Sequence, residues 1–199
     1  MTRRGLCVSA GAVVIGLSKP AWADDWMAYG TDPRQRLRLF SGRGAGPHPL
    51  VIMAVGAERV PDRALALTAR ALAARGMSVA VVDRRPSRHG FQAHTSDIVR
   101  ALAYLLERGE ALSLDGRFAL WGQGGGANAV LLIARDRRYL AAAHIDARQH
   151  WGTVALGVVP ETDPTFTRPS AYGTGTTPAL YQGRVDQAAQ GTAFLNGLF

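Results

Sequence analysis

The sequence predicts an α/β domain with a mostly parallel sheet and helices on both faces. Three observations support this prediction: apolar runs of strand length recur along the chain, stretches with helical spacing separate them, and glycines stand at the junctions. Such alternation is typical of parallel strands joined by right-handed crossovers, which build a three-layer α/β/α sandwich. Residues 24–199 suit one domain of this kind.

Each element can be placed by its pattern. The first expected strand alternates apolar and polar residues, and the later ones are apolar runs typical of strands covered on both faces. The expected strands are residues 36–40, 50–55, 78–82, 117–121, 151–159 and 179–182. The expected helices are residues 63–75 with Gly76 as C-cap, a helix capped at Thr95 or Ser96 and ending at Gly109, residues 127–134, and residues 187–198. Residues 160–178, rich in Thr, Pro and Gly, are expected to form a long loop.

The first 23 residues have the pattern of a cleavable export signal. A basic start at Arg3-Arg4 precedes an apolar stretch over residues 5–18, and Ala21-Trp22-Ala23 fits a cleavage site before Asp24. The apolar stretch is shorter than the roughly 20 residues that span a bilayer. We therefore expect a periplasmic or secreted protein without stable membrane insertion after cleavage; a twin-arginine signal and an ordinary Sec signal both fit.

Composition excludes several classes of site. The one cysteine, Cys7, belongs to the predicted signal, so residues 24–199 contain no thiol for a disulfide, a metal site or a nucleophile. Removing Arg3, Arg4 and Lys19 from the net charge of +8 leaves about +5, all fixed positive charge then being arginine. Because the arginine clusters lack interleaved aromatics, we expect no nucleic-acid partner. No metal or cofactor is expected, and the sequence carries no signal for oligomeric state.

The most informative motif is a glycine turn between a strand and a helix. Residues 118–121 are apolar, Gly122-Gln123-Gly124-Gly125-Gly126 follows, and a helical stretch begins at Ala127. This order is the setting of a nucleophile elbow, G-x-S-x-G. Gly124 stands at the position of the serine, and it offers no nucleophilic atom.

Four segments together resemble the α/β-hydrolase fold, in its small esterase and carboxylesterase-like branch. Residues 50–56 resemble the strand that ends in the family's His-Gly oxyanion turn, and residues 120–127 resemble its elbow. Residues 81–86 resemble its Val-Asp-Tyr-Arg stretch, and residues 90–105, with Asp97, resemble the helix that follows. The resemblance covers roughly Leu37 to Phe199 and implies a serine, an acid and a histidine as catalytic triad.

The departures from this pattern are as informative as the matches. Gly124 replaces the serine, and Val55 replaces the oxyanion-turn histidine, although Gly56 is kept. Asp186 matches the triad acid. The resemblance implies a further strand and a histidine beyond it, whereas the last histidine is His150; a natural end at Phe199 and a truncation both stay open. Removing triad members typically costs roughly 10⁴-fold in rate, so we expect a degenerate site.

Three functions remain open from the sequence. The favoured one is a binding or interaction module without serine-hydrolase activity, with an unidentified small-molecule ligand at Gly56, Gly122, Gln123, Gly124, Gly125, Gly126 and His94. The second is a diverged active ester or acyl hydrolase that depends on Asp186 or His94, so enzyme activity stays open. The third is nucleotide binding, because residues 122–127 fit G-x-G-x-x-G/A; against it, two strand–helix units precede the turn and only Asp146 is a candidate ribose ligand.

The histidines add little to these hypotheses. His89 and His94 are expected to flank the loop after the second buried strand, where a solvated histidine is the ordinary interpretation. His144, Asp146 and His150 have a spacing that matches no metal motif.

Overall fold

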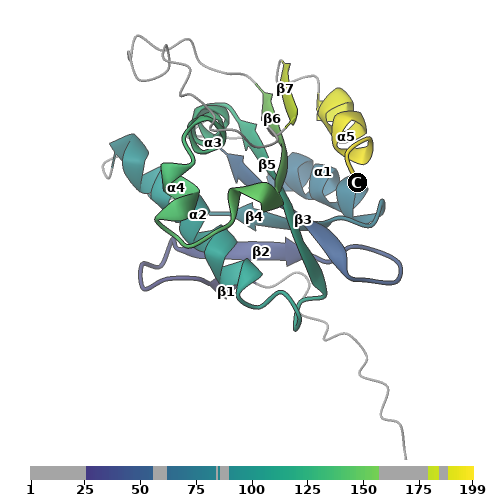
Figure 1. Cartoon of the computed structure of the whole chain (residues 1–199). Helices are drawn as coiled ribbons and strands as arrows, with labels where there is room; N and C mark the ends of the chain where they lie inside the picture. Colours follow the sequence, from purple (N-terminus) through teal and green to yellow (C-terminus); the bar gives the residue numbers. More distant parts are fainter. Residues whose placement is uncertain (1–25, 56–61, 84, 86–89, 157–178, 184–187) are drawn as a thin grey trace, which may run out of the picture.

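A seven-stranded sheet forms the centre of the molecule (Figure 1). The computed structural model describes residues 26–55, 62–83, 85, 90–156, 179–183 and 188–199. The strand order is β1-β2-β4-β3-β5-β6-β7. The strands are β1 (Trp26–Ala28), β2 (Arg36–Phe40), β3 (His48–Val55), β4 (Ser78–Val82), β5 (Leu114–Gln123), β6 (His150–Leu156) and β7 (Ala179–Gly183). β1, β2 and β4 pair antiparallel, and β4, β3, β5, β6 and β7 are parallel, which confirms the mostly parallel sheet.

Helices cover both faces of this sheet (Figure 1). They are α1 (Asp62–Ala73), α2 (Gly90–Leu106), α3 (Gly125–Arg135), α4 (Arg138–Ala141) and α5 (Ala188–Asn196). α2, α3 and α4 share one apolar cluster with one face of the sheet, and α1 and α5 share a second cluster with the other face. The predicted three-layer α/β/α sandwich is thus confirmed.

The central strands are buried on both sides because their successive side chains point to opposite faces. In β5, Phe118 and Leu120 belong to the cluster under α2 and α3, whereas Ala119 and Trp121 belong to the cluster under α1 and α5. This alternation explains why the sequence of the strand is continuously apolar.

Several predicted boundaries are confirmed. β2 and β4 have the expected limits, and β7 and α5 agree within two residues at each end. After α1, Gly76 has a φ of 85°, and its N–H donates to the carbonyl oxygen of Ala73 at 3.1 Å. Gly76 therefore closes this helix, as its sequence position predicts.

The predicted start of α2 was wrong. The helix begins at Gly90, and Thr95 is fully buried within it instead of capping it. Asp97, two residues further on, is 1% exposed and bonded to Arg85, so tertiary contacts hold the first turns of the helix. Packing overrides the local capping signal here.

Other differences concern short or irregular elements. β5 begins at Leu114 instead of Arg117, because Gly116, with a φ of 85°, is accommodated inside the strand. The sequence pattern missed β1, α4 and a short 3-10 helix over Ala147–Gln149, each of four residues or fewer.

Some predictions lie outside the described residues. They are the signal over residues 1–23 with Cys7, residues 157–159 of the predicted strand, the loop over residues 160–178, His89, Gly56 and Asp186. Among the helices that the structure describes, none is long and apolar enough to cross a membrane.

Candidate functional site

Four neighbouring strands end in one row across the carboxyl edge of the sheet. Val55 of β3 lies opposite Gln123 of β5, Gln123 opposite Leu156 of β6, and Leu156 opposite Gly183 of β7. Neighbouring strands are spaced about 4.8 Å apart, so the row spans roughly 14 Å. Sites of open α/β sheets form at such an edge.

Most of the predicted site residues arise from this row. Gly124 directly follows the end of β5. Gly56 directly follows the end of β3, and Asp186 comes three residues after the end of β7. The strand end that precedes Gly56 is therefore next to the glycine turn, and the one that precedes Asp186 is two strands away, while these two residues themselves lie outside the described ranges.

Gly124 has a main-chain conformation that favours glycine. Its φ is 57° and its ψ is −128°, and it is buried between the end of β5 and the start of α3. Its N–H donates to the carbonyl oxygen of Leu156 at 2.9 Å, and its own carbonyl oxygen accepts from Ala127 at 2.8 Å. The predicted strand, tight turn and helix are confirmed, and the turn is fixed at both of its polar backbone groups.

Two flanking glycines are required by close packing. A Cβ atom at Gly122 would overlap the carbonyl oxygen of Gly126, and one at Gly126 would overlap the carbonyl oxygen of Ala54 in β3. The first turn of α3 therefore lies directly against β3 and β5. This packing explains both glycines without a bound phosphate, so the glycine pattern alone does not favour a nucleotide site.

Solved structures with the same arrangement identify the fold. Esterase B from Lactobacillus rhamnosis superposes with a TM-score of 0.61 at 18% identity, over 87% of this chain and 70% of that one. Esterase 2 from Thermogutta terrifontis, phosphorylated by paraoxon, superposes with a TM-score of 0.60 at 14% identity, over 80% and 69%. A bacterial heroin esterase gives 0.56 at 19% identity, over 69% and 45%. The chain has the α/β-hydrolase fold. No protein-family model matches it, and no curated protein matches its sequence.

In this α/β-hydrolase fold the turn leads into a helix whose first turn is free of negative charge. α3 has no acidic residue in its first turn, and Gly125 and Gly126 are its first two residues. Gln123, the last residue of β5, is 8% exposed. The positive end of the helix macrodipole and small side chains together suit an anionic or acyl group.

The sequence suggested that His94 flanks a loop, but the structure places it in a helix. It lies within the first half of α2 and is 7% exposed. A buried helix position makes a solvated role wrong for His94. The role of His94 as a ligand or base stays a prediction.

Three other histidines of the hydrolase fold lie away from the glycine turn. His48 begins β3 and His150 begins β6, at the amino edge of the parallel strands. His150 pairs with Phe118, six residues before Gly124, which places it about 20 Å from the turn along the strand. His144 is exposed, in the turn that follows α4. These positions are unsuited to a base for chemistry at residue 124.

His150 is a neutral core histidine. It is 5% exposed, and its ring stacks on that of Phe118 with centroids 5.0 Å apart. Its Nε2 lies 3.0 Å from both the carbonyl oxygen of Gly152 and the hydroxyl of Thr153. Burial lowers the pKa of His150 from 6.5 to about 4. Among the described residues, no group of three or more His, Cys, Asp or Glu could hold a metal ion.

An ion pair joins Arg85, which follows β4, to Asp97 of α2. The carboxylate of Asp97 accepts from Arg85 Nε at 2.6 Å and Nη2 at 2.8 Å, and from Gln35 Nε2 at 2.9 Å. Burial and the charge of Asp97 together raise the pKa of the nearby Tyr29. The sequence pointed to Asp97 only through the family resemblance. Its partners are 12 and 62 residues away, and no local pattern could have named them.

Proposed function

We propose that this protein is an exported α/β-hydrolase-fold protein without serine-hydrolase activity, which binds a small anionic or acyl ligand at the glycine turn. One observation carries the proposal. Gly124 holds the strained backbone of the elbow position at the carboxyl edge of the sheet, but it has no side chain. The scaffold that would present a nucleophile is therefore present without the nucleophile.

The chemistry of acyl transfer supports the loss of activity. Attack on an ester needs an oxygen or sulfur nucleophile activated by a neighbouring base. Gly124 supplies no such atom, and His48 and His150 lie at the opposite edge of the sheet. Binding without covalent chemistry is what such a site can still perform.

Two structures of a similar protein suggest the probe. Thermogutta terrifontis esterase 2 is phosphorylated by paraoxon, and it has also been solved with propionate bound. We expect paraoxon to leave this chain unmodified, because residue 124 has no hydroxyl. Propionate, a small acyl anion, remains compatible with the first turn of α3.

Propionate titration monitored by backbone amide NMR tests the binding site. We expect saturable shifts at the amides of Gly124, Gly125 and Gly126. Gly125→Asp should abolish them, because its carboxylate would repel the anion, whereas Gly197→Ala, in the turn after α5, should leave them unchanged. Unsaturable shifts, or shifts equally large in Gly125→Asp, would contradict the proposal.

One feature favours a second candidate, a diverged ester hydrolase. The strand that precedes Asp186 ends in the same row as β5, two strands away from it, which is compatible with the acid role that the resemblance implies for Asp186. Such an enzyme would need an activated water, with Asp186 or His94 as base. Asp186→Asn and His94→Gln would then abolish ester turnover, while unchanged rates in both variants would exclude this candidate.

The proposed export depends on residues 1–23 alone. Mass spectrometry of the protein recovered from a Gram-negative host should give a chain beginning at Asp24 in the periplasmic fraction. An intact chain retained in the cytoplasm would contradict the export proposal and leave the binding proposal unaffected.

A further inference from the structure

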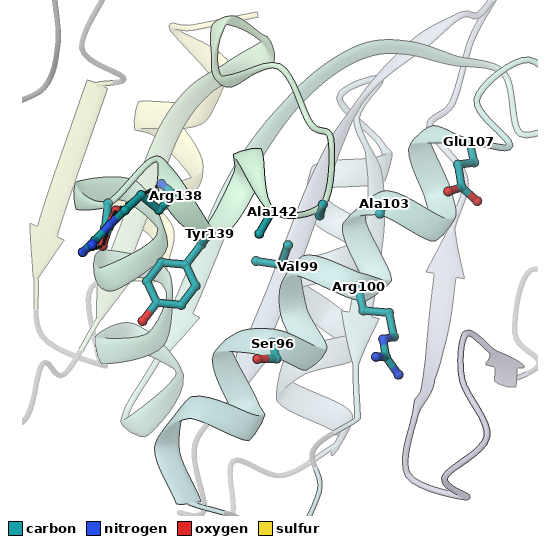
Figure 2. A pocket seen from close by; sticks show the side chains of 10 residues that line it. Ser96, Val99, Arg100, Ala103, Glu107, Arg138, Tyr139 and Ala142 are labelled. Atoms are coloured by element: carbon teal, nitrogen blue, oxygen red, sulfur yellow. Dashed lines mark hydrogen bonds and ion pairs between the residues drawn. The ribbon is translucent and has the colours of Figure 1, made fainter.

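A cavity lies between α2 and α4, on the outer surface of the layer that covers one face of the sheet. Its volume is about 680 Å³, within the range of about 300–1,000 Å³ that is usual for small-molecule sites. Figure 2 shows the side chains along α2 and those from the segment around α4 on either side of it. The glycine turn contributes no lining residue, so the cavity is separate from the proposed elbow site.

The floor of the cavity is apolar and continuous with the core. Val99 is 6% exposed and belongs to the core cluster, and Ala103, Tyr139 and Ala143 pack against that cluster while also lining the cavity. On α2 the apolar lining residues Val99 and Ala103 are about 6 Å apart at the rise of a helix, and polar Ser96 and Glu107 lie beyond them at either end. With Tyr139 and Ala143 across the cavity, these residues form an apolar floor that suits the hydrocarbon part of an amphipathic ligand.

Some charged side chains at the rim of the cavity have an ion-pair partner and others do not. Arg138 makes a bidentate ion pair with Asp136, at 2.9 Å from Nε and 2.7 Å from Nη2. The carboxylate oxygen Oε2 of Glu107 lies 3.5 Å from Nη1 of Arg108. Arg100 also lines the cavity, and among the described residues no carboxylate forms a salt bridge with it. Within the described ranges, Arg100 is therefore the lining cation that no carboxylate pairs with, and it stands beside an apolar floor.

Two hydroxyl groups also line the cavity. Ser96 and Tyr139 line the same cavity from α2 and α4, and Figure 2 shows both near the end of the cavity away from Glu107. Hydroxyls can donate to a carboxylate, and a guanidinium can donate to it bidentately.

We propose that the cavity between α2 and α4 binds an amphipathic carboxylate with a medium-length acyl chain, its chain on Val99 and Ala103 and its carboxylate at Arg100. This site is independent of the glycine turn. It gives the protein a place for a fatty-acid-like ligand whether or not the elbow binds anything.

Decanoate below its micelle concentration is the probe, with calorimetry for affinity and amide NMR for location. We expect saturable decanoate binding with shifts at Val99, Ala103 and Tyr139, whether or not decanoate also shifts the amides of the glycine turn. Arg100→Gln should weaken binding about tenfold, as loss of a charge-assisted contact does. Ala103→Trp, which fills the floor, should abolish binding.

Two matched variants distinguish binding in this cavity from nonspecific attraction and from binding at the glycine turn. Arg75→Gln removes an exposed arginine after α1, on the other side of the sheet, and should leave decanoate affinity unchanged. Gly125→Asp should leave the shifts at Val99, Ala103 and Tyr139 unchanged, because it acts only at the glycine turn. The proposal is overturned if decanoate binding does not saturate, if Arg75→Gln weakens binding as much as Arg100→Gln, or if Ala103→Trp binds like the unmodified protein.

Discussion

The N–H of Gly124 donates a hydrogen bond to the carbonyl oxygen of Leu156 at 2.9 Å, and this contact joins the turn after β5 to the end of β6. The elbow is thereby held in its strained conformation by the neighbouring strand. A protein that has no nucleophile at residue 124 still has the backbone that would present one. Residue 124 thus has the strand–turn–helix setting expected of an elbow, without a side chain.

Gly124→Ala should lower the free energy of unfolding by roughly 1–3 kcal/mol, because a side chain is strained at a φ of 57° and a ψ of −128°. Urea denaturation measures this difference. Gly125→Ala is the control: Gly125 begins α3 and is not among the described glycines with positive φ, so its change should stay below about 1 kcal/mol. Equal losses in both variants would show that the conformation of residue 124 is not special.

Gly126→Ala should lower the free energy of unfolding by about 3 kcal/mol or more, a larger loss than that of Gly124→Ala. Its new methyl group would overlap the carbonyl oxygen of Ala54, and backbone in a central strand cannot move aside cheaply. At Gly197 the nearest atom to a Cβ lies 3.5 Å away, an ordinary contact, so Gly197→Ala should change stability by less than about 0.5 kcal/mol. Thermal unfolding of the two variants tests the close approach of α3 to β3.

Stability should fall as the pH falls from about 6.5 to about 4. Folding lowers the pKa of His150 from 6.5 to about 4, so the unfolded chain binds more protons within that window. The stabilisation is complete above pH 6.5, and its loss by pH 4 amounts to about 3 kcal/mol. His150→Gln should flatten this part of the urea-derived stability profile, while His144→Gln, at an exposed histidine in the turn after α4, should leave it unchanged. A profile unaltered by His150→Gln would contradict the assignment of His150 as a neutral core residue.

Asp97→Asn should destabilise the fold by about 3 kcal/mol, because Asp97 is 1% exposed and its substitution leaves Arg85 without its charged partner. Asp136→Asn breaks an ion pair whose arginine is 90% exposed, and such surface pairs contribute about 0–1 kcal/mol. Chemical denaturation of both variants compares the two pairs directly. Similar losses would mean that burial does not govern their contribution.

The parallel part of the fold was predictable because its signals are local. Residues 78–82 and 118–121 are apolar on both strand faces, and Gly76 and Gly124 mark the ends of a helix and a strand. The start of α2 was not predictable in the same way. Thr95 carries a capping signal, but its burial and the long-range contacts of Asp97 decide the outcome.

The candidate site likewise has one part that local sequence predicts and other parts that depend on long-range contacts. The glycine turn follows from sequence, because one segment contains its strand, turn and helix. The row of four strand ends depends on long-range pairing that joins Val55 to Gly183 through Gln123 and Leu156. The cavity between α2 and α4 depends on tertiary placement of two helices, and no motif marks it.

Ester turnover, measured together with paraoxon modification by mass spectrometry, tests the loss of serine-hydrolase activity in the unmodified protein and in Gly124→Ser. We predict no turnover and no added phosphoryl group for the unmodified protein. For Gly124→Ser we predict no turnover either, because His48 and His150 lie at the opposite edge of the sheet and His94 is buried within α2. Turnover by the unmodified protein that a serine-directed inhibitor abolishes would contradict the proposed loss of serine-hydrolase activity.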